Sequence, residues 1–145
     1  MKVYLAAAWG RRLEIAQVAE QLRALGIEIT SRWLTEETDM SSDRAQFLAE
    51  RAEIDLADVD AADALVRFTD TLAPTVDGRL ISGARMVEFG YAKARGKILY
   101  VVGGHQNVFD YLPGVVHVDD VNELCCVLTA DHWLNFFSTF EEAYE

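Results

Sequence analysis

The stretch Lys97–Gly104, KILYVVGG, has the composition of a strand that is buried on both faces, because apolar residues follow one another without polar interruption. The segment before it, Ser82–Gly96, has apolar residues at helical spacing and ends at a glycine. A helix that leads into a continuous apolar strand is typical of a parallel sheet with crossover helices. This unit therefore predicts an α/β fold.

The same alternation extends outward from this unit in both directions. Five strands alternating with helices predict a parallel sheet with right-handed crossovers, in a flavodoxin-like, Rossmann-type three-layer sandwich that forms one domain over residues 1–145. Ser41 or Ser42 is expected to cap the second helix. The other predicted strands are Val3–Ala8, Ile27–Ser31, Ala64–Phe68 and Val115–Val118; the other helices are Arg11–Leu25, Asp43–Ala62 and the tail from Asp120; the long loops are Trp33–Ser42 and Thr69–Ile81.

Composition excludes several classes of function. The net charge of −11, with 24 acidic and 13 basic residues, argues against binding to duplex nucleic acid but allows a small phosphorylated ligand held by a few arginines. No apolar run reaches membrane-spanning length, so no membrane partner is expected. The adjacent Cys125 and Cys126 are predicted to be buried thiols in a reducing, cytoplasmic compartment. The three histidines have no partners at ligand spacing, so neither a metal nor a cofactor is expected.

Two carboxylates are the first candidates for chemistry. Glu88 falls on the apolar side of a helix, where a charge needs a partner or a role; the alternative is an exposed glutamate near the helix N-terminus. Asp55 precedes a predicted strand and is expected near Glu88. Two carboxyl groups in one pocket can divide the work of nucleophile and proton donor. The other acids of that segment, Asp58, Asp60 and Asp63, are interpreted as solvated, capping or turn residues.

The loops at the carboxyl ends of parallel strands are the expected ligand sites. After the first strand, Ala7 and Gly10 are small enough to admit a ligand, and Arg11 or Arg12 could hold an anion; the alternative is a surface arginine pair.

Two further loops offer weaker candidates. Ser82 and Gly83, near Arg85, open a helix and suit either an N-cap or a phosphate contact. Asn107 could recognise a base or a sugar, or serve as a turn residue.

Taken in order, three motifs resemble the nucleoside 2-deoxyribosyltransferase superfamily, which includes the 2′-deoxynucleoside 5′-phosphate N-hydrolases. They are Val3–Ala7 in the first strand, Asp55-Leu56 followed by Ala62-Asp63 and an apolar strand, and Val87–Ala92. The resemblance extends to about Pro113. It implies that Glu88 attacks the anomeric carbon and forms a glycosyl ester that water or a second base resolves. It also implies that Asp55 supports the sugar and proton transfer, and that Tyr4 positions the nucleophile or the sugar.

One departure within this resemblance points to the substrate. The transferases carry an acid six residues before the nucleophile, whereas the nucleotide hydrolases carry a serine that holds the 5′-phosphate, as Ser82 would here. Ala84 departs from the glycine frequent in those hydrolases. The resemblance therefore implies hydrolysis of a (2′-deoxy)nucleoside 5′-monophosphate. The alternatives are a deoxyribosyltransferase that exchanges bases, a non-catalytic nucleotide sensor and a flavodoxin-like redox protein.

The resemblance also bears on assembly. Asn107–Phe109 looks like the family's Asn-x-Met segment, which a neighbouring subunit contributes to the site, so a homodimer or higher homo-oligomer with shared active sites is expected. The aromatic residues of the tail suit either a subunit contact or the core: Trp133, Phe136, Phe137 and Phe140.

Overall fold

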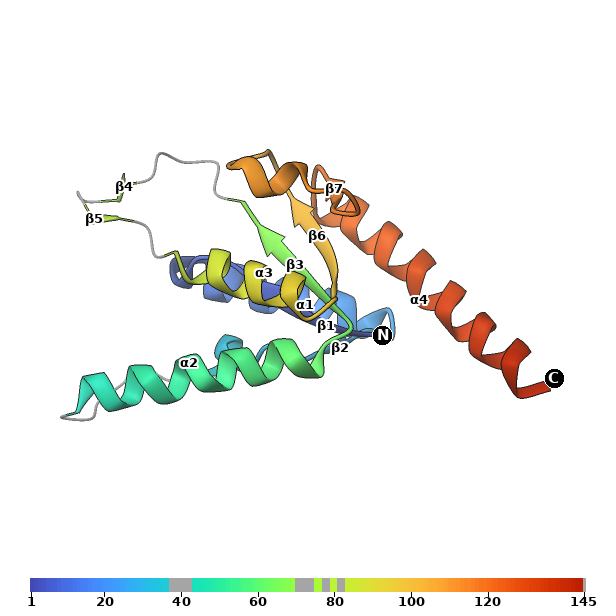
Figure 1. Ribbon diagram of the computed structural model, residues 1–145, viewed down its shortest axis with the longest axis horizontal. Helices are drawn as coiled ribbons and strands as arrows, with labels where there is room; N and C mark the ends of the chain where they lie inside the picture. Colours follow the sequence, from blue (N-terminus) through green and yellow to red (C-terminus); the bar gives the residue numbers. More distant parts are fainter. Residues whose placement is uncertain (37–42, 70–74, 77–78, 81–82, 145) are drawn as a thin grey trace.

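The described part of the chain contains one parallel sheet with helices on both faces. The computed structural model describes residues 1–36, 43–69, 75–76, 79–80 and 83–144, with the backbone alone for 75–76, 79–80 and 140–144. The sheet has the order β2-β1-β3-β6-β7 and every neighbouring pair is parallel, which confirms the flavodoxin-like prediction (Figure 1). Its strands are β1 (Lys2–Ala6), β2 (Glu28–Ile29), β3 (Ala64–Phe68), β6 (Ile98–Val102) and β7 (Val116–Val118).

The helices lie in two pairs on opposite faces of the sheet, as right-handed crossovers require. α2 packs on α3, and α1 packs on α4 (Figure 1). Their bounds are α1 (Arg12–Ala24), α2 (Arg44–Ala61), α3 (Ala84–Ala94) and α4 (Val121–Tyr144). Because all strands run the same way, α1, α2 and α3 begin at the edge of the sheet where β1 and β3 end.

Two predicted loops contain ordered elements. Arg32–Thr35 forms the 3-10 helix η2 instead of polar loop, because the Trp33 Nε1 donates a hydrogen bond to the Leu5 carbonyl at 2.8 Å and buries the indole beside β1. Within the predicted loop after β3, Thr75–Val76 (β4) and Arg79–Leu80 (β5) pair antiparallel. The predicted caps Ser41 and Ser42 lie outside the described residues; Asp43 caps α2 by accepting from the Gln46 N–H at 3.0 Å.

The long terminal helix is only partly core. Leu124 and Leu128 of α4 are fully buried, whereas Trp133, Phe136 and Phe137 are exposed, and Figure 1 shows the C-terminal half of α4 extending beyond the rest of the fold. The core interpretation is therefore wrong for these three aromatics, and the Phe140 side chain lies outside the described residues.

The Cys126 side chain is exposed and Cys125 is half-buried, so the expectation of two buried thiols is also wrong. In the described part of the chain, every helix is too short or too polar to span a membrane.

Candidate active site

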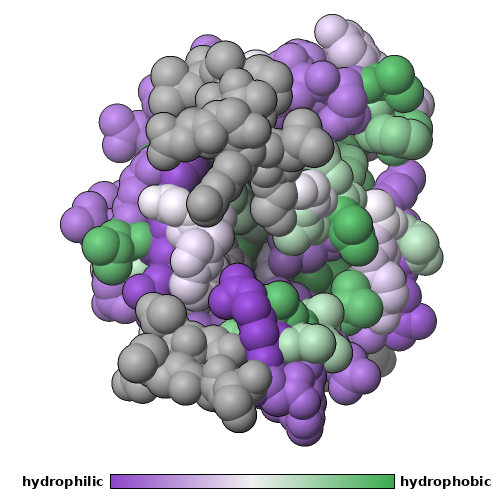
Figure 2. All heavy atoms as spheres, turned by 90° about the vertical axis from the view of Figure 1, so that its left-hand side faces the viewer, coloured by the Kyte–Doolittle hydropathy of each residue, from purple (hydrophilic) through white to green (hydrophobic). Residues whose placement is uncertain are grey.

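A cavity of about 450 Å³ opens where β1 ends and where α2 and α3 begin. Figure 2 views the molecule from this side and shows the surface hollowed near its middle. Its lining combines small residues, aromatic rings, carboxylates and arginines: Ala7, Ala8, Trp9, Trp33, Glu36, Arg44, Phe47, Leu48, Arg51, Asp55, Ala84, Arg85 and Glu88. The position at the carboxyl ends of the strands is the one expected for a ligand site in this fold.

Glu88 is buried in this cavity and is hydrogen-bonded to Tyr4. The Tyr4 Oη donates to the Glu88 Oε1 at 2.8 Å; Tyr4 is fully buried and Glu88 is 9% exposed. The two side chains meet because Tyr4 lies on the face of β1 that α3 covers. Glu88 lies on the same side of α3 as the core residues Phe89 and Ala92. The alternative of an exposed helical glutamate is therefore wrong. A phenol held this way aims the carboxylate and limits its rotation.

Burial raises the pKa values of both candidate carboxyls, and a neighbouring carboxylate adds to each shift. Burial raises the pKa of Glu88 to about 8, with the hydrogen bond from Tyr4 opposing the shift and the charge of Asp55 adding to it. Burial also raises the pKa of Asp55 to about 6, assisted by the nearby charge of Glu36. The pKa of Tyr4 is raised by burial and then by Glu88, so the phenol stays a donor. Between about pH 6 and about pH 8 the two carboxyls together therefore carry one proton, which these pKa values place on Glu88.

Asp55 is brought close to Glu88 as expected. Its Oδ1 is buried and accepts no hydrogen bond from the described residues. A buried acceptor without a donor is costly, so this oxygen is suited to a proton or to a donor that a ligand would bring.

The remaining predicted residues divide into two groups. Ala7 and Arg85 line the cavity, and Arg85 is buried in the first turn of α3. Among the described residues, the lining does not include Gly10, Arg11, Arg12, Gly83 or Asn107. Ser82 lies outside the described residues. The structure thus places Ala7 and Arg85 in the cavity wall and the other described residues of the predicted ligand set outside it.

The two arginines after β1 have structural contacts. Arg11 donates to Glu14 at 2.7 and 2.9 Å and to the Thr69 carbonyl at 3.1 Å. Arg12 donates to the Glu36 carbonyl at 2.7 Å, and its guanidinium lies over the Trp9 ring at 5.1 Å, so it holds the end of η2 against the 3-10 helix η1 (Trp9–Arg11).

Gly10 and Gly83 have no close neighbour that a side chain would displace. An added Cβ at either position would meet no described heavy atom within 4 Å. Contacts within the described chain therefore do not require glycine at these positions, and the expectation that Gly10 admits a ligand stays a prediction. Gly83 is the N-cap residue of α3.

Asn107 caps the 3-10 helix η3 (Val108–Tyr111). Its Oδ1 accepts from the Phe109 N–H at 2.9 Å, and its Nδ2 lies 3.5 Å from the Met86 Sδ. The turn interpretation is therefore confirmed, and Asn107 lies outside the cavity of its own chain.

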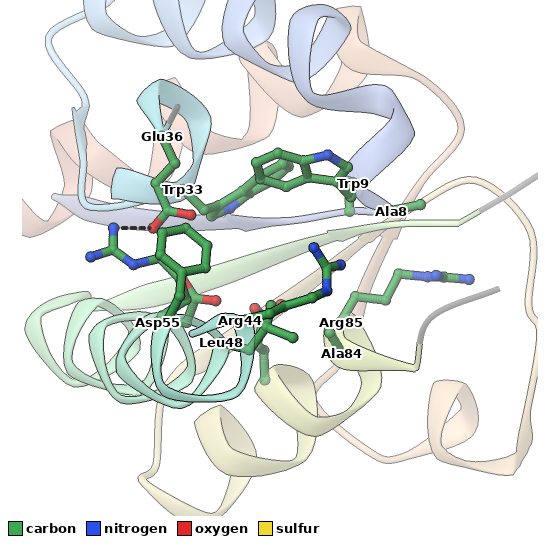
Figure 3. Close-up of a pocket in the computed structure, with 13 residues that line it drawn as sticks. Ala8, Trp9, Trp33, Glu36, Arg44, Leu48, Asp55, Ala84 and Arg85 are labelled. Carbon is green, nitrogen blue, oxygen red and sulfur yellow. Dashed lines mark hydrogen bonds and ion pairs between the residues drawn. The ribbon is translucent and has the colours of Figure 1, made fainter. Parts of the chain in front are cut away.

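The cavity also contains residues that sequence reasoning missed. They are Arg44, Leu48 and Arg51, which precede the predicted Asp55 at successive spacings of four, three and four residues, so all four lie on one face of α2. That spacing was a usable signal. Figure 3 shows Arg44 reaching into the cavity below Trp9.

Asp58 corrects another expectation. It is buried, and it accepts from the Arg32 Nε at 2.7 Å and the Arg32 N–H at 2.9 Å, so it is not solvated. Asp60 accepts from the Tyr91 hydroxyl at 2.7 Å, and Asp63 accepts from the backbone N–H of Lys2 in β1 at 2.7 Å, so both carboxylates make tertiary contacts.

Solved structures of other proteins share this architecture. The fold is that of the nucleoside 2-deoxyribosyltransferase-like proteins, which confirms the resemblance at the level of fold. A CMP N-glycosidase of Clostridium botulinum, BcmB, matches with a TM-score of 0.56 and 18% identity over 88% of this chain and 98% of its own. A 2-deoxyribosyltransferase of Bacillus psychrosaccharolyticus matches with a TM-score of 0.65 and 18% identity over 86% of this chain and 90% of its own.

A conserved protein of Enterococcus faecalis V583 also matches, with a TM-score of 0.60 and 18% identity over 86% of this chain and 94% of its own. Neither a protein-family model nor a curated protein sequence matches this chain.

Proposed function

We propose that this protein is an enzyme that cleaves the N-glycosidic bond of a (2′-deoxy)nucleoside 5′-monophosphate, with Glu88 as nucleophile and water as acceptor. The observation that carries the proposal is the buried Glu88 carboxyl, held by Tyr4 beside Asp55 in a cavity. The two neighbours named as a CMP N-glycosidase and a 2-deoxyribosyltransferase support N-glycosidic chemistry on this fold.

The reaction would follow two displacements at C1′. In the reactive form Glu88 is ionised and Asp55 holds the proton. An oxygen of the Glu88 carboxylate bonds to C1′ as the C1′–N bond breaks; the bonding electron pair leaves with the base, which takes the proton from Asp55. Water then attacks C1′, the ester bond to Glu88 breaks, and the water proton returns to Asp55. Two carboxylates beside a cationic sugar stabilise the oxocarbenium-like transition state, as in retaining glycosidases.

Two arginines of the cavity wall are the candidates for holding the phosphate. Arg85 lies in the first turn of α3 and Arg44 in the first turn of α2, and both line the cavity. Helix N-termini present free N–H groups and a positive dipole end to an anion. We therefore assign the 5′-phosphate to Arg85, Arg44 and the start of α3, in place of Arg11 and Arg12.

Product analysis tests this function. The protein is incubated with a deoxynucleoside monophosphate, and separately with a deoxynucleoside and a second free base. Release of free base and sugar phosphate from the nucleotide is the expected result. Efficient exchange of bases on the unphosphorylated nucleoside would instead establish the transferase alternative, and binding without consumption would establish the sensor.

The shared proton predicts a bell-shaped pH profile. The proposed reaction needs one carboxyl ionised and the other protonated. The value of kcat/KM should therefore rise with an apparent pKa of about 6 and fall with an apparent pKa of about 8. In Asp55→Asn, only the ionisation of Glu88 remains, so the alkaline limb should disappear while the rate falls roughly 10²- to 10⁴-fold. Steady-state rates across this pH range measure both effects. An alkaline limb that persists in Asp55→Asn would exclude Asp55 as the proton donor.

We infer that two copies of this chain share their active sites through η3. Val108, Phe109 and Tyr111 of η3 are 74%, 61% and 72% exposed, which is unusual for three apolar side chains on one short element. Asn107 precedes them and lies outside the cavity of its own chain. An isologous dimer would cover this surface and bring Asn107 to the cavity of the partner subunit.

Complementation tests the shared site. Glu88→Ala and Asn107→Ala are each expected to be inactive, and mixing them in equal amounts should restore about a quarter of wild-type activity, because half of the dimers carry one intact site. Rates of base release after subunit exchange measure this. Phe109→Asp should shift the protein to monomer in light scattering. Mixtures that stay inactive although the subunits exchange would show that each chain completes its own site.

A further inference from the structure

A second charged pair lies in the wall of the same cavity. The Arg51 Nη1 donates to the Glu36 Oε1 at 3.1 Å, and the Glu36 side chain is only 11% exposed and that of Arg51 31%. The Arg51 guanidinium lies over the Phe47 ring at 5.2 Å, which fixes its orientation. Because desolvating such a pair offsets much of its attraction, the pair is weak evidence for a stabilising role. Because both residues line the cavity, the pair is instead a candidate for contacting a ligand.

The pair lies at the end of the cavity opposite to Arg85. Figure 3 shows Glu36 and Arg85 on opposite sides of the cavity, with Asp55 and Arg44 between them. The electrostatic neighbours agree: Glu36 raises the pKa of Asp55, and the pKa of Glu88 is raised by Asp55 and lowered by Arg85. The order along the cavity is therefore Glu36, Asp55, Glu88, Arg85.

If the protein binds a nucleotide as proposed above, this order fixes the orientation of the nucleotide in the cavity. With the phosphate at Arg85 and C1′ at Glu88, the base extends toward Glu36. Aromatic side chains line that region: the Trp9 and Trp33 ring centroids are 6.2 Å apart, and Phe47 lies beneath Arg51. Flat apolar surfaces accept any base by stacking, so they leave the choice of base to the polar groups at its edge.

The pair presents an asymmetric edge to a base. A carboxylate only accepts hydrogen bonds, whereas a guanidinium only donates them. We propose that Glu36, held by Arg51, selects bases with an exocyclic amine, such as cytosine and adenine, over the corresponding oxo bases uracil and hypoxanthine. The amine donates to Glu36, and the adjacent ring nitrogen accepts from Arg51. An oxo base reverses both groups: its carbonyl oxygen faces the carboxylate and its ring N–H faces the guanidinium.

Two pairs of nucleotides test this selection, because CMP and UMP, or AMP and IMP, differ only at that edge. Binding is measured by calorimetry to Glu88→Ala, which keeps the ligand intact. The amine-bearing member of each pair should bind roughly 5- to 150-fold more tightly, the range that one bidentate contact to a base edge provides. Glu36→Gln supplies a donor as well as an acceptor, so the ratio should fall toward one. Equal binding of both members, a ratio unchanged in Glu36→Gln, or no binding of any of the four would overturn the proposal.

Two further variants keep the test sharp. Arg51→Gln removes the other half of the pair and should also reduce the ratio, so the proposal remains testable if Glu36→Gln does not fold. Glu50→Gln is the matched control, because Glu50 lies on the same helix, is exposed and pairs with Gln46; it should leave the ratio unchanged. Turnover is not needed for this readout. Selective binding without base release would refute the proposed function alone, whereas base release without selectivity would refute only the role of Glu36.

Discussion

Replacement of Glu88 by glutamine is expected to lower kcat by roughly 10³- to 10⁵-fold, because the amide has the shape of the carboxyl but cannot form the glycosyl ester. The Tyr4 hydroxyl, which lies 2.8 Å from Glu88 Oε1, can still donate to the amide oxygen, so the fold should be retained. The rate of free-base release from a nucleotide is the measurement. Glu53→Gln is the matched control, since Glu53 is exposed on α2. A Glu88→Gln protein with wild-type turnover would exclude the double-displacement mechanism.

The Glu88→Gln variant should also change how the Tm of the protein depends on pH, and this effect can be measured without any turnover. The pKa of Glu88 is raised from 4.5 to about 8, so the folded protein binds this proton more tightly than the unfolded chain does. The favourable contribution is therefore complete below about pH 4.5 and is lost as the pH rises through about 8. Glu88→Gln lacks this loss, so its Tm should rise relative to that of the wild type across this range. A difference in Tm that is constant with pH would contradict the burial of the carboxyl.

Replacement of Arg67 by methionine is expected to lower the free energy of unfolding by about 3–5 kcal/mol, because it leaves a buried carboxylate without its counter-charge. Arg67 and Asp110 are both fully buried and 2.5 Å apart. Asp110 also accepts from the backbone N–H groups of Gln106 and Asn107 at 2.6 and 3.2 Å. These contacts hold the pKa of Asp110 below its usual value despite burial. Urea unfolding with circular dichroism measures the loss.

A double-mutant cycle separates the ion pair from other effects of the substitution. Asp110→Asn keeps an acceptor for the two backbone N–H groups, so the double variant Arg67→Met/Asp110→Asn should be more stable than the sum of the single losses predicts. Arg95→Met is the control, because the Arg95–Asp60 pair has the same chemistry but is exposed, and its Tm should change little. Additive losses in the buried cycle would show that the pair itself contributes nothing.

Arg67 also connects the sheet to both proposed parts of the site. Its Nη1 lies 3.0 Å from the Met86 Sδ of α3, and its guanidinium lies 4.7 Å from the centroid of the Phe89 ring, next to Glu88. Through Asp110 it supports the loop that carries Asn107 and the exposed face of η3. Loss of Arg67 should therefore weaken both stability and the proposed subunit contact.

Much of the fold was determined by local sequence alone. The continuous apolar runs at β1, β3 and β6 and the helical spacing between them define a parallel sheet, because only strands covered on both faces lack polar alternation. The same periodicity placed Glu88 on the buried side of α3, and chain topology placed Asp55 near it. Such features depend on neighbours in sequence and on the common edge where parallel strands end.

Tertiary structure alone decided which side chains meet. The Tyr4–Glu88 hydrogen bond, the Glu36–Arg51 pair and the Arg67–Asp110 pair join residues that are 84, 15 and 43 positions apart. No local pattern encodes these partners, because each depends on the rotamers and burial that packing imposes. For the same reason Arg12 holds η2 instead of lining the cavity. The apolar residues of α4 likewise divide into a buried part, with Leu124 and Leu128, and an exposed part, with Trp133, Phe136 and Phe137. The raised pKa values of the two carboxyls also arise only when packing removes water from both.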